Sequence, residues 1–166
     1  MKTIGLAVAS CVLASGLLAS AQETKAPPAT PTHTMVQPAE FKWGPGPAAL
    51  PKGGEMVVLS GDPGKPAPFV LRARIPAGYK IPPHWHPTDE HITVLSGSFS
   101  FGMGDTFDPK ALKTLTAGGY AVMPAEMRHS AWSKGGATIQ VHAMGPFAIT
   151  YVNPADDPRN AKPTTP

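Results

Sequence analysis

Residues 90–104, EHITVLSGSFSFGMG, carry the clearest structural signal in the chain. Successive side chains of a β-strand point to opposite faces, and Ile92 and Val94 alternate here with their neighbours. The pattern breaks at Gly97 and then resumes with three large apolar side chains, Phe99, Phe101 and Met103. A period of two residues, rich in β-branched and aromatic side chains, predicts half-buried β-strands.

Similar segments on both sides extend this prediction to a whole domain. Each is short, alternates apolar side chains and ends near glycine or proline, at residues 55–61, 69–78, 114–124 and 137–152. The chain has 17 Gly and 21 Pro, which interrupt helices and supply turns, and only 15% of its residues are charged. Its 166 residues fit one domain with flanking segments better than two domains. We therefore predict an all-β fold, a sandwich or a small barrel.

The first 21 residues have the pattern of an export signal. Lys2 precedes an apolar run over residues 4–20, and the Ala-Ser-Ala before Gln22 is a typical cleavage pattern. We therefore predict that residues 1–21 are a cleaved signal peptide and that the mature protein is periplasmic or secreted, without a membrane anchor. Two alternatives stay open, which are an uncleaved anchor and lipid attachment at Cys11.

Segments rich in proline flank the predicted domain. Residues 22–39 are predicted as a Pro/Thr-rich flexible leader, residues 40–152 as the folded domain, and residues 153–166 as a flexible tail. The net charge of +3 is scattered and forms no Lys/Arg cluster, which argues against a nucleic-acid partner. Because the only cysteine, Cys11, leaves with the signal peptide, any metal must be held by histidine and carboxylate.

Three histidines and two carboxylates lie within residues 84–91, HWHPTDEH. His84 and His86 are two residues apart on an extended segment, so both imidazoles point to one face. If the chain turns at Pro-Thr-Asp, Glu90 begins the next strand and faces the same interior. Two imidazoles and a carboxylate suit a divalent first-row metal, and His129, placed after another turn, is a candidate fourth ligand.

These residues also resemble the motifs of the cupin superfamily. The first motif is matched at every fixed position, by Gly78, His84, His86, Glu90 and Gly97. The second motif is matched at Gly118, Pro124 and His129. It departs at two positions, because Glu126 stands where the family usually has Gly and Ser133 where it usually has Asn.

The resemblance covers residues 40–152 and has consequences for fold and cofactor. It implies a cupin-type small β-barrel, the double-stranded β-helix or jelly roll of two antiparallel sheets. It also implies one divalent transition metal inside the barrel, held by His84, His86, Glu90 and His129. A homodimer is a further expectation that rests on the resemblance alone.

The ligand set does not select a reaction, because similar cupins include dioxygenases, isomerases, decarboxylases and proteins that only bind a ligand. Our leading prediction is a metal-dependent enzyme that acts on a small organic molecule as a dioxygenase-like oxidoreductase. The alternatives are a non-catalytic binding or sensing protein, a zinc-type isomerase or hydrolase, and a barrel whose histidines are structural. Export favours Zn or Cu, which bind more tightly than Fe or Mn, and Fe, Mn and Ni remain open.

Four further residues are candidates for substrate binding. The spacing along residues 138–146 places Gln140 and His142 on one strand face, which is either interior or exterior. Arg72 and Arg74 also share a strand face, and one of them in the barrel mouth would favour an anionic substrate.

Overall fold

The structure is a computed structural model that describes residues 33–161. The predicted signal peptide and most of the predicted leader lie outside these residues, so both stay predictions. Within residues 33–161 there is no α-helix, and no helix is long and apolar enough to cross a membrane.

The described residues form β-strands joined by turns, together with three short 3-10 helices. The strands are β1 (Gly44–Pro45), β2 (Glu55–Ser60), β3 (Pro68–Ile75), β4 (Tyr79–Trp85), β5 (Glu90–Met103), β6 (Lys113–Thr116), β7 (Tyr120–Met123), β8 (His129–Ser133), β9 (Ala137–Met144) and β10 (Thr150–Tyr151). The 3-10 helices are η1 (Pro38–Glu40), η2 (Pro154–Asp156) and η3 (Pro158–Asn160). The last two lie within the segment predicted as a flexible tail.

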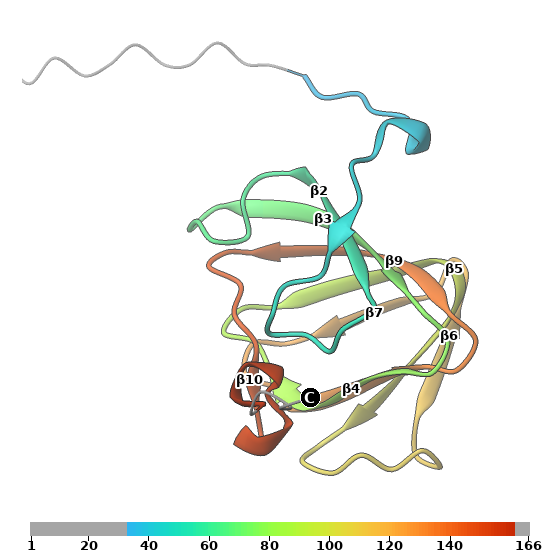
Figure 1. Cartoon of the computed structure of the whole chain (residues 1–166), viewed down its shortest axis with the longest axis vertical. Helices are drawn as coiled ribbons and strands as arrows, with labels where there is room; N and C mark the ends of the chain where they lie inside the picture. The colour runs from blue at the N-terminus through green and yellow to red at the C-terminus, as the bar shows by residue number, and fades with distance from the viewer. Residues whose placement is uncertain (1–32, 162–166) are drawn as a thin grey trace, which may run out of the picture. The chain divides into compact units, whose positions relative to one another are not determined.

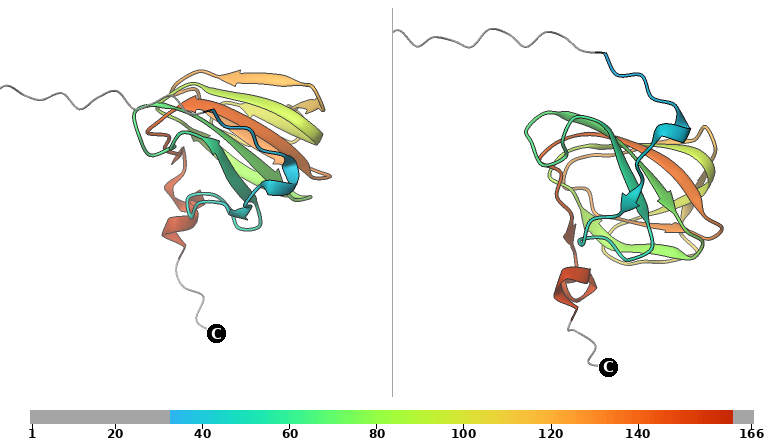
Figure 2. Two further views of the ribbon diagram at one scale, coloured as in Figure 1. Left: turned by 90° about the horizontal axis from the view of Figure 1, so that it is seen from above. Right: turned by 45° about the horizontal axis from the view of Figure 1, so that its top comes forward.

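All strand pairs are antiparallel, and they form two layers that share β5 (Figure 1). One layer runs β1-β2-β3-β9 to the first half of β5, which also pairs with β7. The other layer runs from the second half of β5 through β8 and β4 to β10, with β6 on the far side of β5. The turned views show the curvature of both layers (Figure 2). The predicted all-β fold with two antiparallel sheets is confirmed.

Gly97 marks the point where β5 passes from one layer to the other. The residues of β5 up to Gly97 pair with β9, and the pairing of β5 with β6 begins at Ser98. Gly97 has φ +71°, and a Cβ there would collide with the carbonyl oxygen of Gly136. Only glycine fits such a conformation at such close backbone approach. The sequence break at Gly97 is therefore a bend within one strand of 14 residues.

The core lies between the two layers and follows the predicted alternation. Ile92 and Val94 are 2% and 0% exposed, whereas Leu95 on the opposite face is 37% exposed. Buried apolar side chains line both layers, including Phe69, Leu71, Ile81, Phe99, Phe101, Ile139 and Val141. Burial of this kind supplies most of the favourable free energy of folding.

Two buried tyrosines fasten the segment that follows β1. The Tyr79 hydroxyl donates a hydrogen bond to the carbonyl oxygen of Pro51, and the Tyr151 hydroxyl donates to that of Ala49 at 2.8 Å. Burial raises the pKa of Tyr79 to about 12 and also raises the pKa of Tyr151. Both hydroxyls therefore keep the proton that they donate to the segment.

Candidate metal centre

A proline pair in β4 positions the first histidine of the site. Pro82 and Pro83 have no N–H to donate, and the pairing of β4 with β8 shifts between Ile81 and His84. Beyond the shift, His84 lies directly opposite His129 on β8. Two imidazoles from different parts of the chain are thereby placed on neighbouring strands, and both are buried.

The turn between β4 and β5 positions the other two candidate ligands. The carbonyl oxygen of His86 accepts a hydrogen bond from the N–H of Glu126 at 2.8 Å. The Asp89 carboxylate accepts one from the N–H of Ala125 at 2.7 Å, in agreement with its predicted role in the turn. Glu90 then begins β5, as predicted, and its side chain is buried.

Glu126 adopts the conformation that glycine usually supplies at this point. Its φ is +64°, and among the described residues it is the one non-glycine with positive φ. A left-handed conformation costs a non-glycine residue about 1 kcal/mol or more. The turn forms despite this substitution, and its N–H still bonds the carbonyl of His86.

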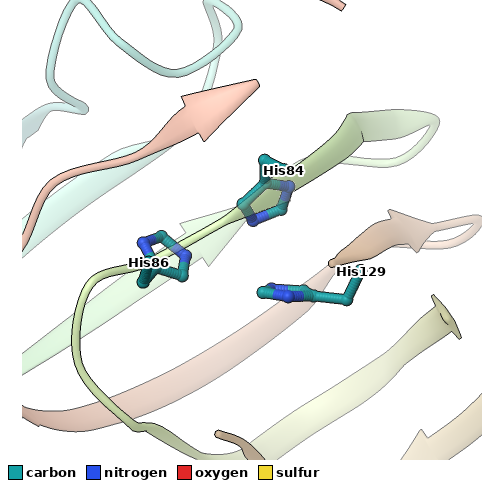
Figure 3. Close-up of side chains that lie close together, drawn as sticks. All are labelled: His84, His86 and His129. Atoms are coloured by element: carbon teal, nitrogen blue, oxygen red, sulfur yellow. The ribbon is translucent and has the colours of Figure 1, made fainter. Parts of the chain in front are cut away.

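Figure 3 shows the imidazoles of His84, His86 and His129 pointing toward one another. One ring nitrogen from each can be chosen so that all three lie within 4.8 Å of one another. The carboxylate Oε2 of Glu90 lies 3.5 Å from Nε2 of His129 and 3.7 Å from Nε2 of His86. The structure thus brings the three histidines together, with Glu90 beside two of them.

Backbone carbonyls fix the orientation of each ring. In His84, Nδ1 lies 2.7 Å from the carbonyl oxygen of Pro82. In His86, Nδ1 lies 2.7 Å from the carbonyl oxygen of Ala148. In His129, Nδ1 lies 2.9 Å from the carbonyl oxygen of Met127. A carbonyl oxygen only accepts hydrogen bonds, so Nδ1 carries the proton in all three rings. Each Nε2 is left with a free lone pair, which is the form in which histidine binds a metal.

Burial also favours the neutral form of His84 and His86. Burial, with repulsion from His129 and His86, lowers the pKa of His84 to about 3. Burial lowers the pKa of His86 in the same direction, although Glu90 opposes the change. Burial alone would raise the pKa of Glu90, but the interactions of its carboxylate with His129, His86 and His84 lower that pKa overall. Neutral imidazoles beside an ionised carboxylate are the protonation states of a metal cage.

The donor atoms fit a divalent metal. Unprotonated Nε2 atoms of His86 and His129 face the Glu90 carboxylate, so lone pairs face lone pairs and only a cation or a proton relieves the repulsion. First-row metals bind such atoms at about 2.0–2.2 Å, which separates two ligands by at most about 4.4 Å. The distances of 3.5 and 3.7 Å lie within that limit.

The histidines line a partly open cavity of about 680 Å³ between the two layers. Its walls include Leu71 of β3, Phe99 and Phe101 of β5, and Val141 of β9. A volume of this size is typical of pockets for small organic molecules.

The four residues predicted to bind substrate lie outside this cavity. On β9, Val141 is buried, whereas His142 is exposed, so the alternation places Gln140 and His142 on the outer face. Arg72 donates a hydrogen bond from Nε to Oε1 of Gln140 at 2.8 Å. Arg74 lies 3.9 Å from the centre of the Trp43 ring and also lies outside the cavity lining. The cavity therefore gives no support to their predicted role.

Two residues near the site carried no signal in the sequence. The Phe147 ring stacks on His86, with 4.2 Å between ring centres, and Ala148 supplies the carbonyl that orients His86. Both belong to the segment between β9 and β10. Ala148 lies 62 positions after His86 in the sequence. A backbone carbonyl leaves no trace in residue identity, so no local pattern could have found it.

Several solved structures share this fold. A polyketide cyclase, RemF, from Streptomyces resistomycificus is 19% identical, with a TM-score of 0.61 over 76% of this chain and 90% of that chain. A protein provisionally named an acetylacetone dioxygenase, from Methylibium petroleiphilum, is 22% identical, with a TM-score of 0.59 over 78% and 87%. An RmlC-like cupin from Shewanella frigidimarina is 16% identical, with a TM-score of 0.54 over 69% and 94%.

These similarities confirm the cupin-type fold that the motifs implied. Comparison with curated proteins gave no significant match. The family model for the ChrR cupin-like domain, however, matches residues 31–148, which is most of the chain. The chain belongs to the ChrR cupin-like domain family.

Proposed function

We propose that this protein is a metal-dependent enzyme that acts on a small organic molecule, and that its reaction is a dioxygenase-like oxidation. One observation carries the proposal: three imidazoles with free Nε2 atoms and one carboxylate meet at the wall of a cavity large enough for such a molecule. The similarity to a protein provisionally named an acetylacetone dioxygenase supports the oxidative reading.

The chain's own residues have distinct tasks in this proposal. His84, His86 and His129 present neutral nitrogens, and Glu90 supplies the negative charge that a divalent cation requires. A metal bound there would supply redox chemistry or the polarisation of a substrate oxygen. The cavity walls are mainly apolar, and electrostatic interactions are stronger beside such walls than in bulk water.

We further propose that the protein is exported and that Zn or Cu is its metal. The signal pattern of residues 1–21 supports export, and outside the cytoplasm both metals outcompete Fe and Mn on affinity. Zinc has no redox chemistry, so a dioxygenase reaction requires copper or another redox-active metal. Elemental analysis of native protein decides between these metals.

The reaction is tested by metal reconstitution. Metal-free protein is loaded separately with Fe(II), Mn, Ni, Cu or Zn, and oxygen uptake is measured with phenolic and dicarbonyl compounds. We expect uptake with at least one redox-active metal, its loss in His84→Ala, and its retention in His91→Ala. His91 is the matched control, because its side chain lies on the opposite face of β5 and contacts Tyr120.

Each outcome distinguishes a reaction class. If no metal gives uptake above that of His84→Ala, the dioxygenase reading is wrong. Conversion of a compound by the zinc form without uptake would instead identify an isomerase or hydrolase. Metal-dependent binding without any product in mass spectrometry would identify a binding or sensing protein.

A further inference from the structure

Nearly all polar side chains that line the cavity belong to the candidate metal centre. Apart from the three histidines and Glu90, every lining side chain within the described residues is apolar, with the single exception of Arg159. We infer that the cavity takes an uncharged, mainly apolar organic molecule whose oxygen donors lie at one end. The inference rests on the proposed function in one respect, because the metal is the partner of that polar end.

The apolar part of the cavity is contributed by both layers. Leu71, Ile139 and Val141 project from β3 and β9, and Phe99, Phe101 and Ala131 project from β5 and β8. Part of the remaining wall is formed by Pro47 and Leu50. Both belong to the segment after β1 to which Tyr79 and Tyr151 are hydrogen-bonded. Away from the histidines and Glu90, a ligand in the cavity would thus contact mainly hydrocarbon.

Arg159 does not provide an anchor for an anion. Its Nε and Nη2 atoms donate to the Asp157 carboxylate at 2.9 and 2.6 Å, and Nη2 also lies 3.3 Å from the carbonyl oxygen of Ile149. The guanidinium charge is therefore already paired. An anionic group at the apolar end of a ligand would therefore lie in the cavity without a free counter-ion, and burial of an unpaired charge is strongly unfavourable.

Molecules with many hydroxyl groups are disfavoured for a related reason. The lining contains no Ser, Thr, Asn, Gln or Tyr side chain among the described residues. The N–H and C=O groups of the surrounding strands are engaged in the pairing of β3 with β9 and of β5 with β8. Each buried hydroxyl of a sugar would lose its bonds to water without replacement.

Two catechols test this inference on zinc-loaded protein, which cannot oxidise them. The first, 4-tert-butylcatechol, and the second, 3,4-dihydroxybenzoate, carry the same pair of oxygen donors but differ in charge at the other end. Dissociation constants are measured by calorimetry and corrected for the affinity of each compound for free zinc. We expect the tert-butyl compound to bind at least about 100-fold more tightly. Equal or tighter binding of the carboxylate compound would overturn the inference.

A pair of isosteric variants locates the effect in the cavity. Val141→Thr places a hydroxyl in the wall, and Val122→Thr makes the same change on the outer face, where the side chain is 42% exposed. Binding of 4-tert-butylcatechol should weaken about 5-fold in Val141→Thr and stay unchanged in Val122→Thr, with zinc content unaltered in both. Equal affinities in the two variants would contradict the assignment.

Naphthalene separates failure of this inference from failure of the proposed function. It has no donor for a metal, so we expect it to bind both metal-free and zinc-loaded protein, measured by its fluorescence. If the protein fails to take up zinc and still binds naphthalene, the apolar cavity is supported and the metal-dependent function is rejected. Absence of naphthalene binding in both forms would reject the apolar cavity, whatever the metal content.

Discussion

The burial of His84 predicts that the metal-free protein loses stability in mild acid. The pKa of this imidazole is about 6.5 in an unfolded chain, and burial lowers it to about 3 in the folded protein. Between these values the unfolded chain binds a proton that the folded protein does not bind. The contribution of His84 is therefore fully present above pH 6.5 and is lost progressively as the pH falls toward 3.

The size of the loss follows from the same two pKa values. Between pH 7 and pH 5, His84 alone lowers the free energy of unfolding by about 2 kcal/mol. The lowered pKa of His86 adds a loss in the same direction. The pKa of the Glu90 carboxylate is lowered from 4.5, so Glu90 affects the free energy of unfolding mainly below pH 5. The loss between pH 7 and pH 5 therefore reports mainly on the buried histidines.

Urea unfolding of chelator-treated protein at pH 7 and pH 5 measures this loss. The pH dependence should shrink by about 2 kcal/mol in His84→Gln, because glutamine does not titrate. The matched variant His91→Gln, changed on the outer face, should retain the full dependence. If wild type and His84→Gln lose the same free energy between the two pH values, His84 is not a buried neutral imidazole and the reasoning fails.

Four more predictions concern the turns, the fastened segment and the metal. Glu126→Gly should raise the free energy of unfolding by about 1 kcal/mol, because it relieves φ +64°; a lower stability in urea would contradict this. Tyr151→Phe removes the hydrogen bond to Ala49 and should lower the free energy of unfolding by about 1 kcal/mol and speed proteolysis of the segment near Ala49. Unchanged cleavage would count against that hydrogen bond. Gly97→Ala should cost about 3 kcal/mol or more in thermal unfolding, and a neutral result would disprove the close approach to Gly136. Zinc at 100 times its dissociation constant should raise the free energy of unfolding of the metal-free protein by about 2.7 kcal/mol. No shift in melting temperature would exclude a site of native affinity.

Much of the fold was predictable because apolar alternation is a local property of the sequence. Ile92 and Val94 are buried and Leu95 is exposed, as the period of two residues predicts. The role of Gly97 was less accessible. A glycine in a strand pattern indicates either a chain break or a bend, and only the register of β5 against β9 and β6 shows that the strand continues.

The candidate site was predictable to the extent that its side chains share one short segment or a recognisable motif. The spacing of His84 and His86 indicates a common face, and the second motif indicates His129. The structure brings these three rings together. Their role as ligands stays a prediction until metal is measured.

The surroundings of the site were not predictable, because they depend on contacts between distant segments. Alternation alone could not decide which face of β9 is interior, and the structure places Gln140 and His142 outside. The stacking of Phe147 on His86 joins a loop after β9 to a loop after β4. The apolar character of the cavity likewise emerges only when both layers are in place.

The metal content of protein purified from its native compartment tests the central claim most directly. Elemental analysis should find about one divalent transition metal per chain in wild type, by the donor count of the cage. That metal should be lost in His84→Ala and His129→Ala and retained in His91→Ala. Wild-type protein without metal, or ligand variants that keep it in full, would contradict the account.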